Sequence, residues 1–464
     1  MFIKCGGPLL RQYIVVITVN LTMIAAGMGL MWPSPVFVKL RDKDQTILPE
    51  PITEEQGSWI VSVGFLTGIF GNFMAAYLVD RIGRKLCIII GCLPKFIAGF
   101  LFLYAYDVWM LLVGRALLGI ADAFVFIVVP MYASEVSSKE IRGALGTILQ
   151  VVCSTGVLIM FSMGPFVSYW TLNVIFASVV VATTMPLILL PDSPYFLYSK
   201  GLNHESLKVL TFLRGTETLA IEEIKEYSLL DNNIKIPITQ IFKNKIFLKS
   251  FFIVFFIVGW VHLLGFNTVS FYLQTILDST QTSVQPEIAS VIVGVIQILS
   301  SIVTTFITDR FGRKPILTTT LSAQAVGMVG LGVFFKLQEH GKIEGVLNFL
   351  PLMSLVLIVF GYSAGVGSLN WILCAELFDD AFRGVGLSLS GIISYISLFT
   401  ITKYFSALTL AIGPSYTYWL FSVNCVILCV FIGVVVPETK GKTFSEIQRA
   451  LGAKDKVKDV QEKC

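Results

Sequence analysis

The stretch Asp80-Arg81-Ile82-Gly83-Arg84-Lys85 (DRIGRK, 80–85) returns almost unchanged as DRFGRK at 309–314. Each copy is a charged turn, broken by glycine, between two long apolar runs, and each half of the chain holds one copy. A turn of this kind, repeated between hydrophobic segments, indicates a duplicated membrane bundle. Two similar halves are typical of secondary transporters, which bind substrate near the bilayer midplane where the halves meet.

Two further motifs repeat in the same order. Glu135 stands seven residues before Arg142, and Glu376 stands seven residues before Arg383. A proline-acid motif closes each half, as PDSP in the first and PETK in the second. Three motifs repeating in register are hard to obtain by chance, so the duplication extends over the whole chain.

The composition is that of a membrane protein. Of the 464 residues, 55% are hydrophobic and 14% are charged, against about 25% charged in an average soluble domain. A bilayer core of roughly 30 Å needs about 20 apolar residues per helix. The chain holds twelve such runs, at 13–32, 57–78, 87–106, 109–131, 143–163, 167–190, 247–273, 287–308, 316–336, 348–374, 384–405 and 416–436.

The twelve runs define the domain organisation and predict an all-α membrane protein of two six-helix pseudo-repeat bundles. Most of the 34 Lys and Arg residues fall on one side of the membrane if the N-terminus is inside, so we expect both termini to be cytoplasmic. The expected parts are an N-terminal bundle at 1–190, a cytoplasmic linker with short surface helices at 191–246, a C-terminal bundle at 247–436 and a cytoplasmic tail at 437–464.

The ordered motifs resemble those of the sugar porters of the major facilitator superfamily. The resemblance rests on the paired turns, the two ExxxxxxRG stretches, Gly114-Arg115 and PETKGKTFSEI (437–447), and it covers nearly the whole chain. EEQGSWIVSVGFLTGIFGNFMAAYLVDRIGRK (54–85) and Trp32-Pro33-Ser34-Pro35, which we expect to end the first span, are similar to the branch of insect facilitated trehalose transporters. The resemblance implies the twelve-helix fold of that superfamily.

Charges of the repeated motifs lie at the predicted inner ends of helices. Opposite charges can pair across the halves when the inner mouth closes, and each pair at the water boundary contributes about 0–1 kcal/mol, which suits a switch between states of similar energy. Alternatively, they only mark topology and cap helices. The eight candidate gating residues are Asp80, Arg84, Glu135, Arg142, Asp309, Arg313, Glu376 and Arg383.

Polar side chains in the apolar spans are candidates for binding a sugar. Gln150 and Gln297 are mid-span amides that can donate and accept at once, as a hydroxyl requires, although such amides also join helices. The resemblance places both at pocket positions of sugar porters. It also points to Asn267, which matches the Asn of the QQxSGxN motif, and to Trp371, for which an aromatic-belt role is the alternative. Asn370, beside Trp371, is a further candidate.

The chain also departs from the sugar-porter pattern. Val261-His262 stands where the family usually has Gln-Gln, and Ser394-Tyr395 stands in place of Asn-Trp. His262 can bind a hydroxyl, carry a proton or bond a neighbouring helix. Proton-coupled sugar porters place an acid in the first span, and residues 27–32 contain none. Facilitated diffusion is therefore the simpler interpretation.

Two charges that the family pattern does not require lie deep in the third and fourth spans. Lys95 and Asp122 are both about nine residues from the inner ends of their helices, on the order of 13 Å deep. A lone charge there is costly, whereas a paired one is tolerable, so we hypothesise a structural Lys95–Asp122 ion pair. The alternatives are that Asp122 pairs with Arg115, that Asp122 lines the cavity, and that Lys95 snorkels alone.

Taken together, the sequence predicts a facilitative transporter for trehalose or a hexose such as glucose in the cell membrane. A non-transporting nutrient sensor on the same fold and a proton-coupled sugar symporter are the alternatives. No nucleophile–base–acid arrangement, phosphate loop or metal-ligand spacing is visible, so we expect neither an enzyme nor a bound cofactor or metal. The expected partners are a small sugar and the lipid bilayer, with no nucleic acid and no obligate protein partner.

Overall fold

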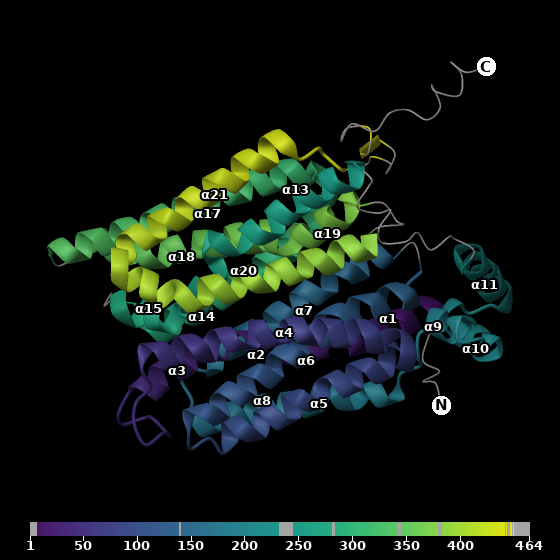
Figure 1. Cartoon of the computed structure of the whole chain (residues 1–464), viewed down its shortest axis with the longest axis horizontal. Helices are drawn as coiled ribbons and strands as arrows, with labels where there is room; N and C mark the ends of the chain where they lie inside the picture. The colour runs from purple at the N-terminus through teal and green to yellow at the C-terminus, as the bar shows by residue number, and fades with distance from the viewer. Residues whose placement is uncertain are drawn as a thin grey trace. The chain divides into compact units, whose positions relative to one another are not determined.

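The structure is a computed structural model in which every regular element of the described residues is helical (Figure 1). It describes residues 7–138, 141–231, 245–280, 284–341, 345–378 and 383–440, together with Lys442, Glu446, Ile447 and Arg449. Within these ranges the side chains at 142–147, 229–231, 245–246, 305, 309, 371, 375 and 383–385 are not described.

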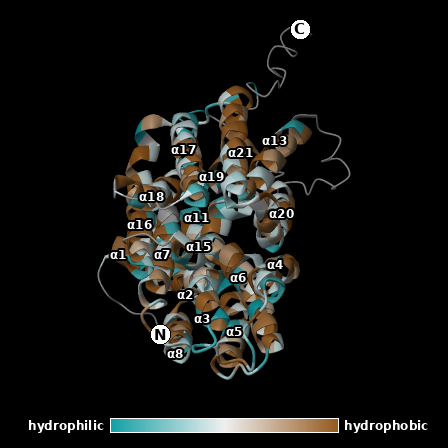
Figure 2. Ribbon diagram, turned by 90° about the vertical axis from the view of Figure 1, so that its left-hand side faces the viewer, coloured by the Kyte–Doolittle hydropathy of each residue, from teal (hydrophilic) through white to brown (hydrophobic). Residues whose placement is uncertain are grey.

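Eleven helical stretches of the described residues are long and apolar enough to cross a membrane, and Ile148–Met163 is a shorter apolar helix. They match the twelve runs predicted from hydropathy, and the brown of hydrophobic residues recurs along their ribbons in Figure 2. Helices form here because lipid offers no partner for a backbone N–H or C=O, so each span must satisfy its own.

The first six spans follow the predicted order. They are α1 (Pro8–Asn20) with α2 (Thr22–Met31) and α3 (Pro33–Arg41), α4 (Glu54–Ile82), α5 (Arg84–Leu103), α6 (Val108–Val136), α7 (Arg142–Met163), and α8 (Tyr169–Thr184) with the 3-10 segment Met185–Leu189. The second six are α13 (Lys245–Val261) with η2 (His262–Leu264) and α14 (Phe266–Phe271), α16 (Pro286–Phe311), α17 (Arg313–His340), α18 (Leu350–Gly361) with η4 (Tyr362–Val366) and α19 (Gly367–Leu377), α20 (Arg383–Ile412), and α21 (Pro414–Val435). Two short segments, α15 (Leu273–Thr280) and η3 (Gly345–Phe349), precede the second and fourth of these six.

Three spans differ from a simple continuous helix. The expectation that Trp32-Pro33-Ser34-Pro35 ends the first span is wrong, because α3 begins at Pro33 and continues to Arg41. Proline is tolerated in the first turn of a helix, where its missing N–H has no partner to lose. The seventh span breaks at η2 before Gly265, whose φ of 83° is left-handed. The tenth span contains a turn of π-helix, η4, a feature frequent at functional sites.

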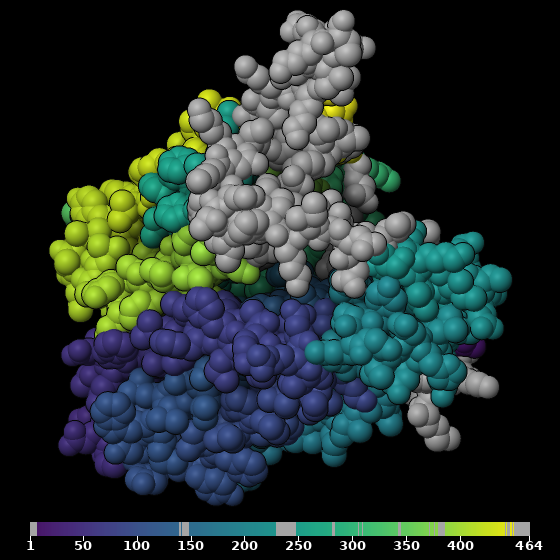
Figure 3. Space-filling model, turned by 45° about the vertical axis from the view of Figure 1, so that its right-hand side comes forward, coloured from purple at the N-terminus to yellow at the C-terminus, as the bar shows by residue number. Residues whose placement is uncertain are grey.

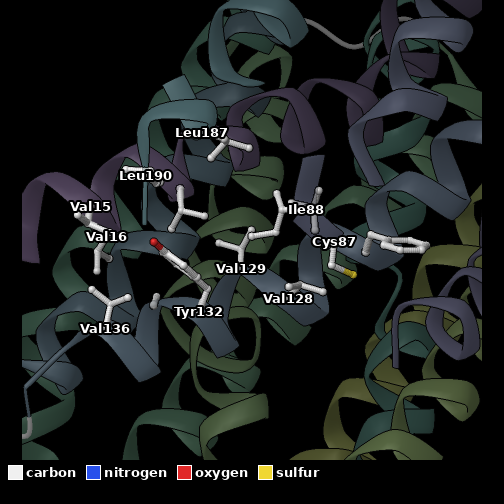
Figure 4. Close-up of a cluster of buried hydrophobic side chains, with 14 of the residues drawn as sticks. Val15, Val16, Cys87, Ile88, Val128, Val129, Tyr132, Val136, Leu187 and Leu190 are labelled. Carbon is white, nitrogen blue, oxygen red and sulfur yellow. The ribbon is translucent and has the colours of Figure 1, made fainter. Parts of the chain in front are cut away.

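Contacts divide the molecule into two compact units. The first unit takes the described residues of Met1–Ile234, Thr268–Ile298 and Thr402–Ser406, and the second takes those of Lys235–Asn267, Leu299–Ile401 and Ala407–Cys464. Each unit has its own apolar core. In the first unit, side chains of α1, α5, α6 and the segment after α8 converge around Tyr132, whose hydroxyl donates to the carbonyl of Pro191 at 2.8 Å (Figure 4).

The linker forms three short helices, as predicted: α9 (Pro194–Ser199), α10 (Asn203–Arg214) and α11 (Glu217–Asp231). They gather beside the N-terminal helices of the first unit as the teal mass in Figure 3. Arg11 and Gln12 of α1 donate to carbonyls at the end of α10, each at 3.0 Å. Arg214 donates to the Val136 carbonyl at the end of α6, so the linker helices are tied to two spans.

Candidate functional site

The first repeated turn joins α4 to α5 through Gly83, whose φ is 92°. A Cβ at this position would overlap the Asp192 carboxylate, so only glycine fits both the backbone conformation and the contact. Asp192 accepts from the backbone N–H groups of Arg84 and Lys85, at 3.2 and 3.4 Å. The PDSP motif therefore caps the N-terminus of α5, where the helix dipole favours a negative charge.

Arg84 forms ion pairs with two carboxylates near this turn, Glu135 and Asp80. Its guanidinium donates to the Glu135 carboxylate from Nε and Nη2, the shortest distance being 2.9 Å, and Asp80 lies 3.3 Å away on the preceding turn. Ser193 also donates a hydrogen bond to Glu135. The Arg84 side chain is only 4% exposed, more buried than a charge at the water boundary would be. Its pairing is therefore less screened than we expect for a surface pair.

The second turn repeats this arrangement in the second unit. Gly312 has φ 85°, and the Glu438 carboxylate occupies the space that a Cβ there would need. Glu438 accepts from the backbone N–H groups of Arg313 and Lys314, both at 3.0 Å, and Arg313 pairs with Glu376 at 3.0 Å. Burial opposes ionisation of Glu438, but the N–H donors outweigh it and lower the pKa of the carboxyl group. PETK thus caps α17 as PDSP caps α5.

The described charges pair within a unit, Arg84 with Glu135 and Arg313 with Glu376. The side chains of Arg142, Asp309 and Arg383 lie outside the described part of the chain, and so does that of Trp371. The repeated turns consequently build two matching capped corners, each with an Arg–Glu pair. Their gating role stays a prediction.

The break in the seventh span brings two predicted residues together. Asn267 Nδ2 lies 3.0 Å from His262 Nδ1, and His262 Nε2 lies 2.6 Å from Ser394 Oγ on α20. Gln324 of α17 donates to the Leu264 carbonyl at 3.2 Å and so satisfies a backbone group at the break. Ser394 was visible in the sequence only as a departure from the family pattern, because nothing local marks it as a partner of His262.

Gln150 and Gln297 lie on two helices of the first unit that pack together. A Cβ on Gly294 of α16 would lie 2.9 Å from the Leu158 side chain of α7, so the helices are in close contact there. Gln297 lies about one turn beyond Gly294, and Gln150 lies about two turns from Leu158. Gln150 is half-buried and Gln297 is buried. Asn370 is also buried, in the second unit, where its Oδ1 accepts from the Cys374 thiol at 3.6 Å.

The hypothesised ion pair between α5 and α6 is confirmed. Lys95 Nζ lies 2.8 Å from Asp122 Oδ1, and the side chains are 1% and 10% exposed. Arg115, the rival partner, instead donates to the backbone carbonyls of Gly29 at 2.6 Å and Ile60 at 3.0 Å. Backbone carbonyls of the first and second spans therefore bind Arg115, and Lys95 is the ion-pair partner of Asp122.

Sequence analysis missed a polar cluster in the first unit. Lys403 of α20 lies 2.9 Å from Ser58 Oγ and 4.2 Å above the Trp59 ring, and Ser406 donates to Glu54 at 2.8 Å. A single Lys in an apolar span is the signal that could have found this cluster, since such charges are rare and partnered. Among the described residues, no group of three His, Cys, Asp or Glu could hold a metal ion.

Comparisons with known proteins agree with this architecture. The family model described as "Sugar (and other) transporter" matches residues 23–451. The facilitated trehalose transporter of Polypedilum vanderplanki is 29% identical over 447 residues, covering 95% of this chain and 88% of that protein. Its counterpart in Culex quinquefasciatus is 28% identical over 444 residues, covering 95% and 86%. The chain spans about half the length of other such relatives, for example 56% of the one from Anopheles gambiae.

Solved structures show the same fold. The inward-open xylose transporter XylE from E. coli superimposes with a TM-score of 0.79 at 21% identity, covering 95% of this chain and 99% of that one. XylE bound to 6-bromo-6-deoxy-D-glucose, titled a proton:xylose symporter, gives 0.76 with the same coverage. Motifs, fold and the extent of the family match lead to one conclusion: the chain is a multi-pass membrane protein that belongs to the sugar (and other) transporter family of the major facilitator superfamily.

Proposed function

We propose that this chain is a facilitative carrier that moves trehalose or a hexose such as glucose down its gradient by alternating access. The observation that carries the proposal is the uncharged hydrogen-bonding cluster of Asn267, His262 and Ser394 at the break of the seventh span. Broken helices at mid-membrane are where transporters of this kind bind substrate. Neutral groups that both donate and accept suit sugar hydroxyls, and the names of the insect relatives support trehalose.

The substrate contacts in this proposal are Gln150 and Gln297 from the first unit and His262, Asn267, Asn370 and Trp371 from the second. The capped corners act as the inner gate. When the carrier changes state, the Arg84–Glu135 and Arg313–Glu376 pairs exchange partners with charges of the opposite half. Both termini lie in the cytoplasm and the protein resides in the plasma membrane, in keeping with the distribution of Lys and Arg.

Proton-coupled symport is the second candidate, and one observation favours it. Asp122 Oδ2 lies 3.9 Å from where a Cβ on Gly29 would be, so an acid from the fourth span reaches the first span. The salt bridge argues against it, because Lys95 at 2.8 Å already holds the Asp122 carboxylate in a buried ion pair.

The test is uptake of radiolabelled trehalose and D-glucose by proteoliposomes that contain the full-length protein, with and without a protonophore. We expect uptake to reach equilibrium with the external sugar, not to exceed it, and to be unchanged by the protonophore. Accumulation above equilibrium that the protonophore abolishes would establish symport instead. Absence of uptake for every sugar offered, by protein that still melts cooperatively, would refute sugar transport and favour a sensor.

A further inference from the structure

A short stretch of α20 belongs to a different unit from the rest of its helix. Thr402–Ser406 packs with the first unit, whereas the described residues before and after it belong to the second. Lys403 Nζ donates to Ser58 Oγ of α4 at 2.9 Å. Ser406 Oγ donates to Glu54, also of α4, at 2.8 Å. The two partners on each helix are three or four residues apart, so one face of α20 is joined to one face of α4.

Ser58 and Trp59 together hold the ammonium group of Lys403. Ser58 donates its own proton to the Glu55 carbonyl at 2.8 Å, so its oxygen is left to accept from the lysine. The same ammonium lies 4.2 Å from the centroid of the Trp59 ring, which is a cation–π distance. Ser58 is buried and Lys403 is half-buried. Among the described residues, no carboxylate forms an ion pair with this lysine, so its contacts on α4 are with neutral groups.

The neighbouring contact of Ser406 extends to the first span. Glu54 Oε2, which accepts from Ser406, also lies 2.7 Å from Arg41 Nη2. Arg41 is the last residue of α3, and Glu54 is the first residue of α4, where the helix dipole favours a negative charge. One carboxylate oxygen therefore joins the ends of the first and second spans to the eleventh.

A cation held by neutral groups can be released at low cost. When Lys403 leaves Ser58 and Trp59, no carboxylate stays behind buried and unpaired, unlike the partner of a broken ion pair. The half-buried ammonium only has to return to water. A cation–π contact in such a setting changes an equilibrium constant by about two- to thirtyfold. That range is enough to bias two states of similar energy without locking either one.

We propose that Arg41, Glu54, Ser58, Trp59, Lys403 and Ser406 form an outer latch, and that Lys403 sets the balance between the outward-open and inward-open states. The inference rests on the proposed function and its orientation. With the N-terminus inside, the first span ends and the second begins at the outer surface, and the eleventh approaches that surface past Lys403. Substrate enters from outside only when the outer ends of the two bundles separate, so the latch must open in each cycle.

The test measures access to a cysteine beneath the latch in the full-length protein. Ser62 is buried one turn deeper than Ser58 on the same face of α4, and Ser62→Cys places a thiol there. Intact cells that express this variant are treated with a membrane-impermeant maleimide, and the parent protein gives the background from native cysteines. The rate of modification reports the fraction of carrier that is open to the outside, and it is measured without sugar.

Adding Lys403→Met or Trp59→Leu should speed this modification about fivefold, whereas Lys403→Arg, which keeps a cation on the ring, should stay within about twofold of the starting rate. Lys336→Met is the matched control, because Lys336 lies over the Tyr416 ring at 5.4 Å within the second unit. Lys403→Met should also lower the KM for sugar entry and raise the KM for sugar exit. The apparent affinity on each side follows the fraction of carrier open to that side, and a merely structural defect would not move the two in opposite directions.

Unchanged modification rates in folded Lys403→Met and Trp59→Leu would overturn the latch and leave sugar transport intact. Modification of Ser62→Cys only from the cytoplasmic side would overturn its outer position. If Lys403→Met does not fold, Trp59→Leu decides, because it removes the same contact from the other helix. Faster modification in a protein that takes up no sugar would support the latch while refuting the proposed substrate, so the two failures can be told apart.

Discussion

The Lys95–Asp122 pair allows a prediction whose magnitude follows from its geometry. Asp122→Asn removes the charge that faces Lys95 Nζ at 2.8 Å and leaves a lysine whose side chain is 1% exposed. Breaking a buried ion pair by removing one partner costs about 3–5 kcal/mol, because the remaining charge stays buried without compensation. Arg115 cannot compensate the remaining charge, because its guanidinium is a cation like Lys95.

The expected result is a drop in melting temperature on the order of 5 °C for Asp122→Asn and a similar drop for Lys95→Met. Replacing both residues, as Lys95→Met with Asp122→Leu, should recover most of the loss, because a buried pair exchanged for apolar side chains is often neutral. The charge-swapped protein, Lys95→Asp with Asp122→Lys, should melt above either charge-reversed single variant.

The assay is the melting of purified protein in detergent or nanodiscs, followed by tryptophan fluorescence and analysed as a double-mutant cycle. Lys336→Met is the control, because Lys336 pairs with Glu339 on an exposed helix face and its loss should leave the melting temperature unchanged. If the two single variants melt with the wild type, or if their effects simply add in the double variant, the pair does not stabilise the bundle as argued.

Three further outcomes are expected. Gln150→Leu and Gln297→Leu should each lower sugar uptake at least tenfold while the amount of protein at the cell surface is unchanged; normal uptake by both would remove them from the binding site. Uptake by the wild type should not respond to a protonophore, and a response would direct attention to Asp122. The lowered pKa of Glu438 means that its carboxylate stabilises the fold above the unfolded pKa, near 4.3, and that this stability is lost as the pH falls through the folded pKa. Glu438→Gln should therefore lower the melting temperature at pH 7 and flatten its decline between about pH 5 and pH 3; a wild-type pH profile would contradict the cap.

The sequence was sufficient to predict the fold, the number of spans and the repeated corners. Hydropathy predicts spans well because every backbone group in lipid must be satisfied within its own helix. The two turn glycines, Gly83 and Gly312, could also be recognised in the sequence. Each has a positive φ, which favours glycine, and a carboxylate occupies the space that a Cβ would need. Helix ends were less predictable: α1 begins at Pro8 and α4 at Glu54, several residues before the apolar runs, because capping and polar turns extend a helix beyond them.

The partners of polar side chains were decided by the tertiary structure. The sequence left Asp122 with two possible partners; in the folded protein Lys95 lies 2.8 Å from it, and Arg115 donates to the carbonyls of Gly29 and Ile60. Three roles for His262 were likewise compatible with the sequence. Its hydrogen bond to Ser394 joins residues that are 132 positions apart. Hydrophobicity is a property of each residue and its near neighbours, so it can be read along the chain. A hydrogen bond depends on the distance and direction between two atoms, and helices far apart in sequence set these only when they pack.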